Sequence, residues 1–215
     1  MSPLTAIAFR SAAGRDRRGG AALRPRNQRP PCPGGRTLAE VVMWKTPSPP
    51  ILVLGLGNTL LGDDALGVEL VGELEREISD PGVEFLDGGT QGMALLGHLA
   101  ERREIIVLDA VALGHPPGTL HILSRGEVLG LGAASSTAHD GNAGELLRAS
   151  LLLGDLPERV AVIGIEPARV RTGIGLSGEV RRAVPAALEA ARASLAEALG
   201  RLAVGAPPPD RLTLE

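Results

Sequence analysis

Four short apolar segments in this chain each lead to an acidic residue, directly or through one glycine-rich turn. The segments are 51–55, 83–86, 105–108 and 161–165, and the acids that follow them are Asp63 with Asp64, Asp87, Asp109 and Glu166. Continuous apolar segments of this length are typical of strands that are buried on both faces of a sheet. Because ligands bind at the carboxyl ends of parallel strands, the pattern predicts several carboxylates at one ligand-binding edge.

Helical signals alternate with these strands. Apolar residues recur at helical spacing in four segments, which are 66–78, 93–99, 140–153 and 180–202, and Ser177 is a candidate N-cap for the last. This alternation predicts an α/β domain with a five-stranded sheet. The connection before the fourth strand, 119–123, is too short for a parallel crossover, so we expect that strand to be antiparallel.

Charge divides the chain into unequal parts. Residues 1–50 carry nine basic and two acidic residues, whereas the remainder carries 13 basic and 23 acidic residues. We interpret 1–49 as a disordered basic extension rich in Pro, Gly and Arg, 50–204 as a single α/β domain, and 205–215 as a frayed tail. Met43 offers an alternative start, in which case the extension would be an artefact of start-codon choice. No apolar segment follows Arg17 and Arg18, which argues against a twin-arginine export signal.

Composition argues against several classes of function. Phe9, Trp44 and Phe85 are the only aromatic residues, so the chain lacks the stacking platform of single-stranded nucleic acid binders. The single Cys32 lies in the extension, which leaves the domain without a cysteine nucleophile and fits a reducing cytoplasm. No apolar segment has the roughly 20 residues of a membrane span. We expect a cytoplasmic protein that binds neither nucleic acid nor membranes.

The acidic residues support two kinds of interpretation. Asp63 or Asp64 can simply stabilise a helix N-terminus, and Asp87, which two glycines follow, can shape a turn. Asp109 ends a fully apolar strand, so its carboxylate needs a metal, an amide or a cation as a partner. His139 taken alone is more often a surface histidine than a ligand. Together, however, carboxylates and an imidazole suit a divalent metal of borderline hardness.

Five motifs, in this order along the chain, resemble those of the hydrogenase maturation endopeptidases. They are Gly55–Gly67, Leu86–Thr90, Leu108–Ala110, Ala138 with His139, and Ile174–Ser177. The resemblance covers roughly residues 50–200. It implies a three-layer α/β fold of the phosphorylase/hydrolase-like type, with a twisted mixed sheet between helices. It also implies an endopeptidase that removes the C-terminal extension of a nickel-loaded [NiFe] hydrogenase large-subunit precursor.

The same resemblance implies the site residues. Asp64, Asp109 and His139 would bind the metal and carry the catalytic role, with nickel delivered inside the precursor. Three protein ligands leave coordination positions open, as in catalytic rather than structural metal sites. Nickel would report that metal insertion is complete, or would itself polarise the scissile carbonyl or activate water. Asp87 would support the site or shape its loop, and we expect the enzyme to be a monomer.

Two rival functions differ in testable features. Residues 53–58 also look like the opening of a peptidyl-tRNA hydrolase, but the histidine expected after the first turn is missing, and an acidic domain opposes tRNA binding. A non-enzymatic nickel chaperone would use the same three ligands without cleaving a peptide.

Overall fold

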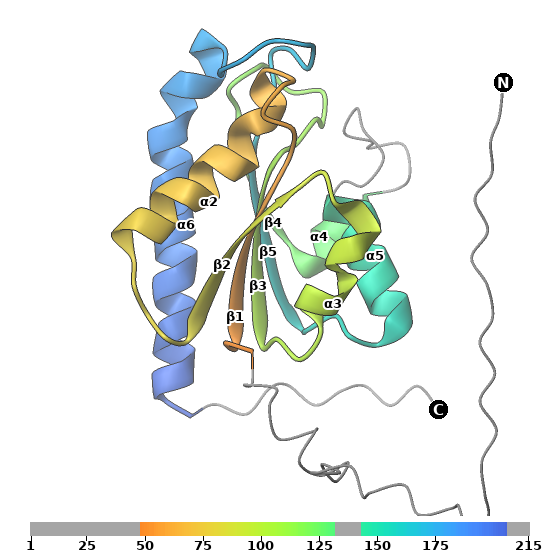
Figure 1. Ribbon diagram of the computed structural model, residues 1–215, viewed down its shortest axis with the longest axis vertical. Helices are drawn as coiled ribbons and strands as arrows, with labels where there is room; N and C mark the ends of the chain where they lie inside the picture. The colour runs from red at the N-terminus through yellow and green to blue at the C-terminus, as the bar shows by residue number, and fades with distance from the viewer. Residues whose placement is uncertain (1–47, 132–142, 206–215) are drawn as a thin grey trace, which may run out of the picture. The chain divides into compact units, whose positions relative to one another are not determined.

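A five-stranded sheet in the order β2-β1-β3-β5-β4 forms the centre of the protein (Figure 1). The computed structural model describes residues 48–131 and 143–205, all within the unit Thr46–Glu215. The strands are β1 (Ile51–Leu56), β2 (Val83–Gly89), β3 (Glu104–Ala110), β4 (Leu120–Ser124) and β5 (Arg159–Ile165). The first three and β5 are parallel, whereas β4 pairs antiparallel with β5, which confirms the predicted mixed sheet.

Helices cover both faces of the sheet. They are η1 (Asp63–Ala65), α2 (Leu66–Glu77), η2 (Gly92–Leu95), α3 (Leu96–Leu99), α4 (Arg125–Gly130), α5 (Ala143–Leu153) and α6 (Gly178–Ala203). Figure 1 shows α2 and α6 on one face and α3, α4 and α5 on the other. Each interface holds its own cluster of buried aliphatic side chains. The predicted three-layer α/β architecture is therefore confirmed.

Helix α4 was not predicted from the sequence. It begins after Ser124, whose side chain accepts from the Glu127 amide while the Glu127 carboxylate accepts from the Ser124 amide. This reciprocal capping box satisfies two amides that a helix start leaves unpaired. The prediction for α6 was better: Ser177 caps it, and the helix continues through Pro185 to Ala203. The predicted helix start at Asp140 lies outside the described residues.

Helix α2 approaches the sheet closely because it presents a glycine there. A Cβ at Gly67 would lie 2.1 Å from the carbonyl oxygen of Leu108 and 2.3 Å from that of Leu56. These two oxygens belong to β3 and β1, so the contact sets the distance of α2 from the two central strands. The start of α2 is thereby held over the carboxyl ends of these strands.

No helix among the described residues is long and apolar enough to cross a bilayer.

We predict that Gly67→Ala destabilises the domain by more than about 2 kcal/mol, since the added methyl group meets backbone that cannot move aside. Gly72→Ala is the matched control in the same helix, because a Cβ there meets only the end of the Arg76 side chain, 3.5 Å away. The control should be neutral or stabilising by up to about 1 kcal/mol, from helix propensity. Urea unfolding of both variants measures the difference, and equal stabilities would contradict the close approach.

Candidate active site

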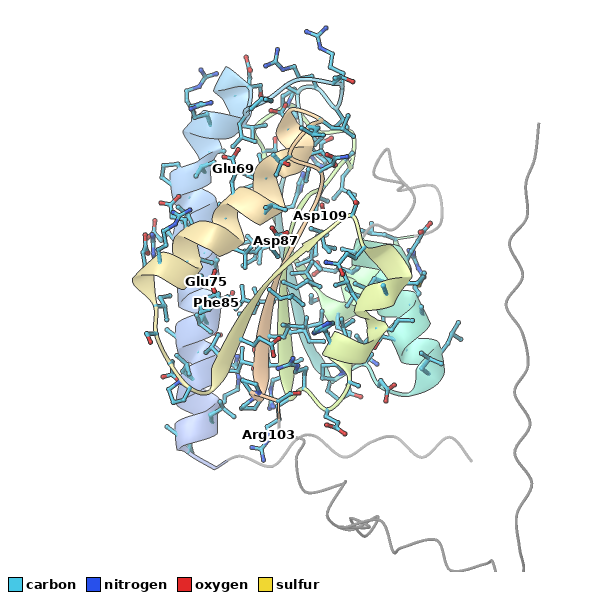
Figure 2. The ribbon with its side chains drawn as sticks, viewed as in Figure 1. Glu69, Glu75, Phe85, Asp87, Arg103 and Asp109 are labelled. Carbon is cyan, nitrogen blue, oxygen red and sulfur yellow. The ribbon has the colours of Figure 1, made fainter. Side chains whose placement is uncertain are left out.

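The carboxyl ends of the parallel strands bring the predicted acidic residues to one end of the sheet. Figure 2 shows Asp87 and Asp109 at this end and Arg103 at the opposite end. Asp63, Asp64, Asp109 and Glu166 are buried, with at most 7% of each residue exposed, whereas Asp87 is exposed. The four buried acids have different hydrogen-bond partners. These partners distinguish carboxylates with a structural role from candidate catalytic or metal-binding carboxylates.

Asp63 is a structural residue. Its Oδ2 accepts from the backbone amides of Ala168 and Arg169, both at 2.9 Å, and its Oδ1 accepts from the amide of Ser177 at 2.5 Å. A buried carboxylate that accepts three amides is well compensated for its loss of water. Asp63 therefore fastens the start of η1 to the loop between β5 and α6, and both of its carboxylate oxygens are engaged by backbone amides.

Asp64 and Asp109 form the candidate site. The Asp64 carboxylate accepts from the amide of Asn58 at 2.8 Å. At the end of β3, Oδ1 of Asp109 accepts from the amide of Ala110 at 2.8 Å. Burial, and secondarily the negative charge of Asp64, raise the pKa of Asp109 to about 7, although the amides of Ala110 and Ala143 oppose the rise. The two carboxyl groups are thus neighbours that repel each other, and both lack a cationic partner among the described residues.

A glycine turn places Asp64 beside β1. A Cβ at Gly57, which has φ +126°, would lie 1.8 Å from the carbonyl oxygen of Asp64. Only glycine therefore allows the loop after β1 to pass this close to η1. The amide that follows Gly57 is that of Asn58, the donor to the Asp64 carboxylate. The glycine-rich motif therefore serves to position an acid.

The third predicted ligand, His139, lies outside the described residues, in the segment 132–142. The described chain resumes at Ala143, the first residue of α5, whose amide interacts with the Asp109 carboxylate. Within residues 48–131 and 143–205, no group of three or more His, Cys, Asp or Glu side chains is placed to hold a metal. The structure therefore brings together two of the three predicted ligands and leaves the place of His139 as a prediction.

Glu166 and His121 form a buried pair that the sequence analysis did not predict. His121 Nε2 lies 3.0 Å from Oε2 of Glu166, and the Glu166 carboxylate also accepts from the amides of Leu113 and Gly114. Burial opposes ionisation of Glu166, but these hydrogen bonds lower its pKa. The pair holds the loop between β3 and β4, which follows Asp109. The pair could have been predicted only from the antiparallel register of β4 and β5. This register places His121 opposite Gly164, two residues before Glu166.

Comparisons with known proteins identify the family and the fold of the chain. The model of the HycI family, described as hydrogenase maturation protease, matches residues 68–194. The chain is 40% identical over 149 residues to the hydrogenase 2 maturation protease of Escherichia coli (strain K12), covering 68% of this chain and 91% of that protein. This chain belongs to the hydrogenase maturation protease family.

Further relatives agree with this assignment. The hydrogenase expression/formation protein HupD of Rhizobium leguminosarum bv. viciae is 40% identical over 149 residues, covering 67% of this chain and 73% of that one. The solved structure of the hydrogenase maturating endopeptidase HybD from E. coli superposes with a TM-score of 0.63 at 38% identity, over 69% of this chain and 93% of that one. As a hydrogenase maturation protease, the chain is a peptidase, which sets aside the tRNA hydrolase and the non-enzymatic chaperone.

In this protease the two adjacent aspartates should differ sharply under substitution. Asp63→Asn turns an amide NH₂ toward backbone donors, so we predict a loss of about 2–3 kcal/mol of stability, the usual cost of disrupting hydrogen bonds to a charged group. Asp64→Asn keeps an acceptor for Asn58 and removes the repulsion with Asp109, so stability should be unchanged or higher. Urea unfolding at pH 8 tests both variants, and a larger loss for Asp64→Asn would contradict the assigned roles.

The raised pKa of Asp109 also predicts how the stability of the metal-free protease depends on pH. The folded form keeps the Asp109 proton up to about pH 7, whereas the unfolded form loses it near 3.8. The folded state therefore binds more protons between these values, and the Asp109 contribution falls as pH rises through that window. The largest possible effect is roughly 4 kcal/mol, from 1.36 kcal/mol per pKa unit.

Asp109→Asn should flatten this slope and stabilise the protease above pH 7, and Asp64→Asn should shift the midpoint to lower pH. Unfolding free energies measured from pH 4 to pH 8 would reveal both changes. An Asp109→Asn variant with the same pH slope as the wild type would show that Asp109 ionises normally.

Proposed function

We propose that this peptidase removes the C-terminal extension of a [NiFe] hydrogenase large-subunit precursor once nickel has been inserted. The observation that carries the proposal is the buried pair Asp64 and Asp109, in which the charge of one carboxylate helps to raise the pKa of the other to about 7. Two buried carboxylates that repel each other are stabilised by a divalent cation, which replaces the repulsion by two attractions. The precursor would bring that cation to the site.

The donor set suits nickel held by a protein substrate. Asp64 and Asp109 supply oxygen ligands, and we assign His139 as the nitrogen ligand. Only three residues separate His139 from Ala143 in the sequence, so a fully extended chain could span at most about 14 Å between the two Cα atoms. Ala143 in turn interacts with the Asp109 carboxylate through its amide. Three protease ligands leave positions for the cysteine thiolates that would already hold nickel in the precursor.

Nickel would thereby act as a checkpoint. A precursor without the ion offers the two carboxylates no attraction, and its scissile bond would not be docked. A loaded precursor gains that attraction, which orients the bond beside the site. The same ion could polarise the scissile carbonyl or activate a water molecule. Both roles require Asp64, Asp109 and His139 together, so the ligand assignment does not depend on the choice between them.

A pocket beside Asp109 could receive a side chain of the bound extension. It is lined mainly by Val111, Leu123, Val128 and Val162, with Asp109 itself in its wall. Its apolar wall suits an aliphatic side chain close to the cleaved bond. We also propose that the enzyme acts in the cytoplasm, since its single cysteine fits a reducing compartment. Its proposed oligomeric state is a monomer.

We predict that Asp64→Asn, Asp109→Asn and His139→Ala each reduce processing of a nickel-loaded precursor by at least about 100-fold, because each removes a direct ligand. Mass spectrometry of the large subunit measures the loss of its C-terminal extension. The variants should remain folded in circular dichroism, since Asp63 rather than these residues holds the loops together.

Matched controls separate the site from general effects of charge. Asp155→Asn changes an exposed acid after α5, and His98→Ala changes a half-exposed histidine of α3. Both should process the precursor at the wild-type rate. Wild-type protein that leaves a nickel-loaded precursor intact, or cleaves an empty one equally fast, would overturn the proposed function.

A further inference from the structure

A cluster of arginines surrounds two exposed aliphatic side chains next to the candidate site. We define the arginine surface by five residues, Leu60, Arg169, Arg171, Ile174 and Arg181. Leu60 is 60% exposed and Ile174 is 87% exposed, and all three arginines are exposed. Single exposed apolar residues are common, but an apolar patch that charged residues border is a candidate contact site.

The arginine surface consists of two loops, joined by backbone hydrogen bonds, and of Arg181 in α6. The amide of Gly62 donates to the carbonyl of Gly173 at 2.8 Å, and the amide of Gly173 donates to the carbonyl of Leu60 at 2.9 Å. Asp63 fastens the same two loops through the amides of residues 168, 169 and 177. Leu60 and Ile174 are therefore presented side by side along the backbone, one on each loop.

Hydrogen bonds also connect this surface to the candidate site. The amide of Leu60 donates to the side-chain oxygen of Asn58 at 2.9 Å, and the amide of Asn58 donates to Asp64 at 2.8 Å. A protein that contacts Leu60 consequently lies near Asp64, the carboxylate that we assign to nickel, because only Leu61–Asp63 separate the two residues in the sequence. The location suits a contact that orients the body of a substrate while its tail enters the site.

The charge of this region is opposite to that of the rest of the domain. The described residues contain 12 arginines, no lysine and 20 acidic residues. Four of these arginines lie between residues 169 and 182, where Glu179 is the only acid. Glu179 pairs with Arg182, and among the described residues no acid pairs with Arg169 or Arg171. Two unpaired cations remain exposed beside an apolar patch on an otherwise acidic protein.

We propose that the arginine surface docks the precursor through an apolar patch that carboxylates surround. The proposal rests on the proposed function, because it assigns a second contact to the same substrate. On an acidic domain, such a basic region attracts the carboxylates of a partner, which would steer the encounter and fix its orientation. Nucleic acid is a weaker fit, since its binders neutralise several phosphates and do not place aliphatic side chains at the centre.

The test compares steady-state processing of the nickel-loaded precursor by full-chain variants. The double variant Arg169→Glu with Arg171→Glu should raise KM at least tenfold at 0.1 M salt and leave kcat within twofold. Arg169 contacts Asp63 through its backbone amide and carbonyl rather than through its side chain, so the fold should be retained. The KM difference should shrink at 0.5 M salt, because exposed charges are screened there. Leu60→Ser with Ile174→Ser should also raise KM, but independently of salt.

The chain offers controls for both kinds of substitution. Arg103→Glu reverses an exposed charge at the opposite end of the sheet (Figure 2), and Leu152→Ser removes an aliphatic side chain that is 87% exposed on α5. Both should leave KM unchanged. A single Arg171→Gln variant, which adds no negative charge, should raise KM by a smaller factor than the double variant. This rise of KM should also shrink at 0.5 M salt.

Several outcomes would overturn the docking proposal. They are an unchanged KM in the double variant, an equal rise for Arg103→Glu, and a charge effect confined to binding of a DNA duplex or of anionic vesicles. A failure of the proposed function looks different, because wild-type protein would then leave the precursor uncleaved at every salt concentration. Cleavage by wild type with no KM change in the variants would reject the arginine surface alone.

Discussion

The Asp63 carboxylate is the contact on which the functional end of the protein depends. Its two oxygens accept amides from residues 168, 169 and 177, which lie more than 100 positions away in sequence. This contact ties the loop after β1 to the loop before α6. Both the position of Asp64 and the joined loops of the arginine surface follow from it. One buried acid thus supports the position of the adjacent acid, Asp64, which we propose as a nickel ligand.

The division between adjacent acids explains how the site can be buried and yet reactive. Buried carboxylates normally have donors that compensate the loss of water, as Asp63 and Glu166 do. Asp109 is compensated less completely, so burial and the Asp64 charge keep its proton to about pH 7. The hydrogen bonds of Asp64 and Asp109 offset their burial only in part. In a hydrogenase maturation protease, such a pair of carboxylates would make substrate binding depend on a metal that the substrate carries. The cost in stability is the physical basis of the proposed selectivity.

Much of this structure was predictable from the pattern of apolar segments and their lengths. The strands, the antiparallel β4 and the Ser177 cap followed from periodicity and from a connection too short for a crossover. The proximity of Asp64 and Asp109 followed from the common edge of parallel strands. Helix α4 is short, and its signal lay only in the Ser124 and Glu127 capping box.

Other features depend on tertiary contacts that no local pattern encodes. The sequence could not assign the structural role to Asp63 rather than to Asp64, because the deciding amides come from the distant loop 168–177. The burial of His121 against Glu166 likewise depends on the register of two strands. The arginine surface combines Arg181 of α6 with residues from two loops whose pairing appears only in three dimensions.

Nickel K-edge X-ray absorption on the loaded precursor, recorded alone and with the full-length protease, tests the central claim most directly. The account predicts that oxygen and nitrogen ligands join the sulfur ligands of the precursor when the wild-type protease is added. A protease carrying both Asp64→Asn and Asp109→Asn should leave the spectrum of the precursor unchanged. An identical nickel spectrum with and without the wild-type protease, while cleavage still proceeds, would contradict the claim that these carboxylates contact the metal.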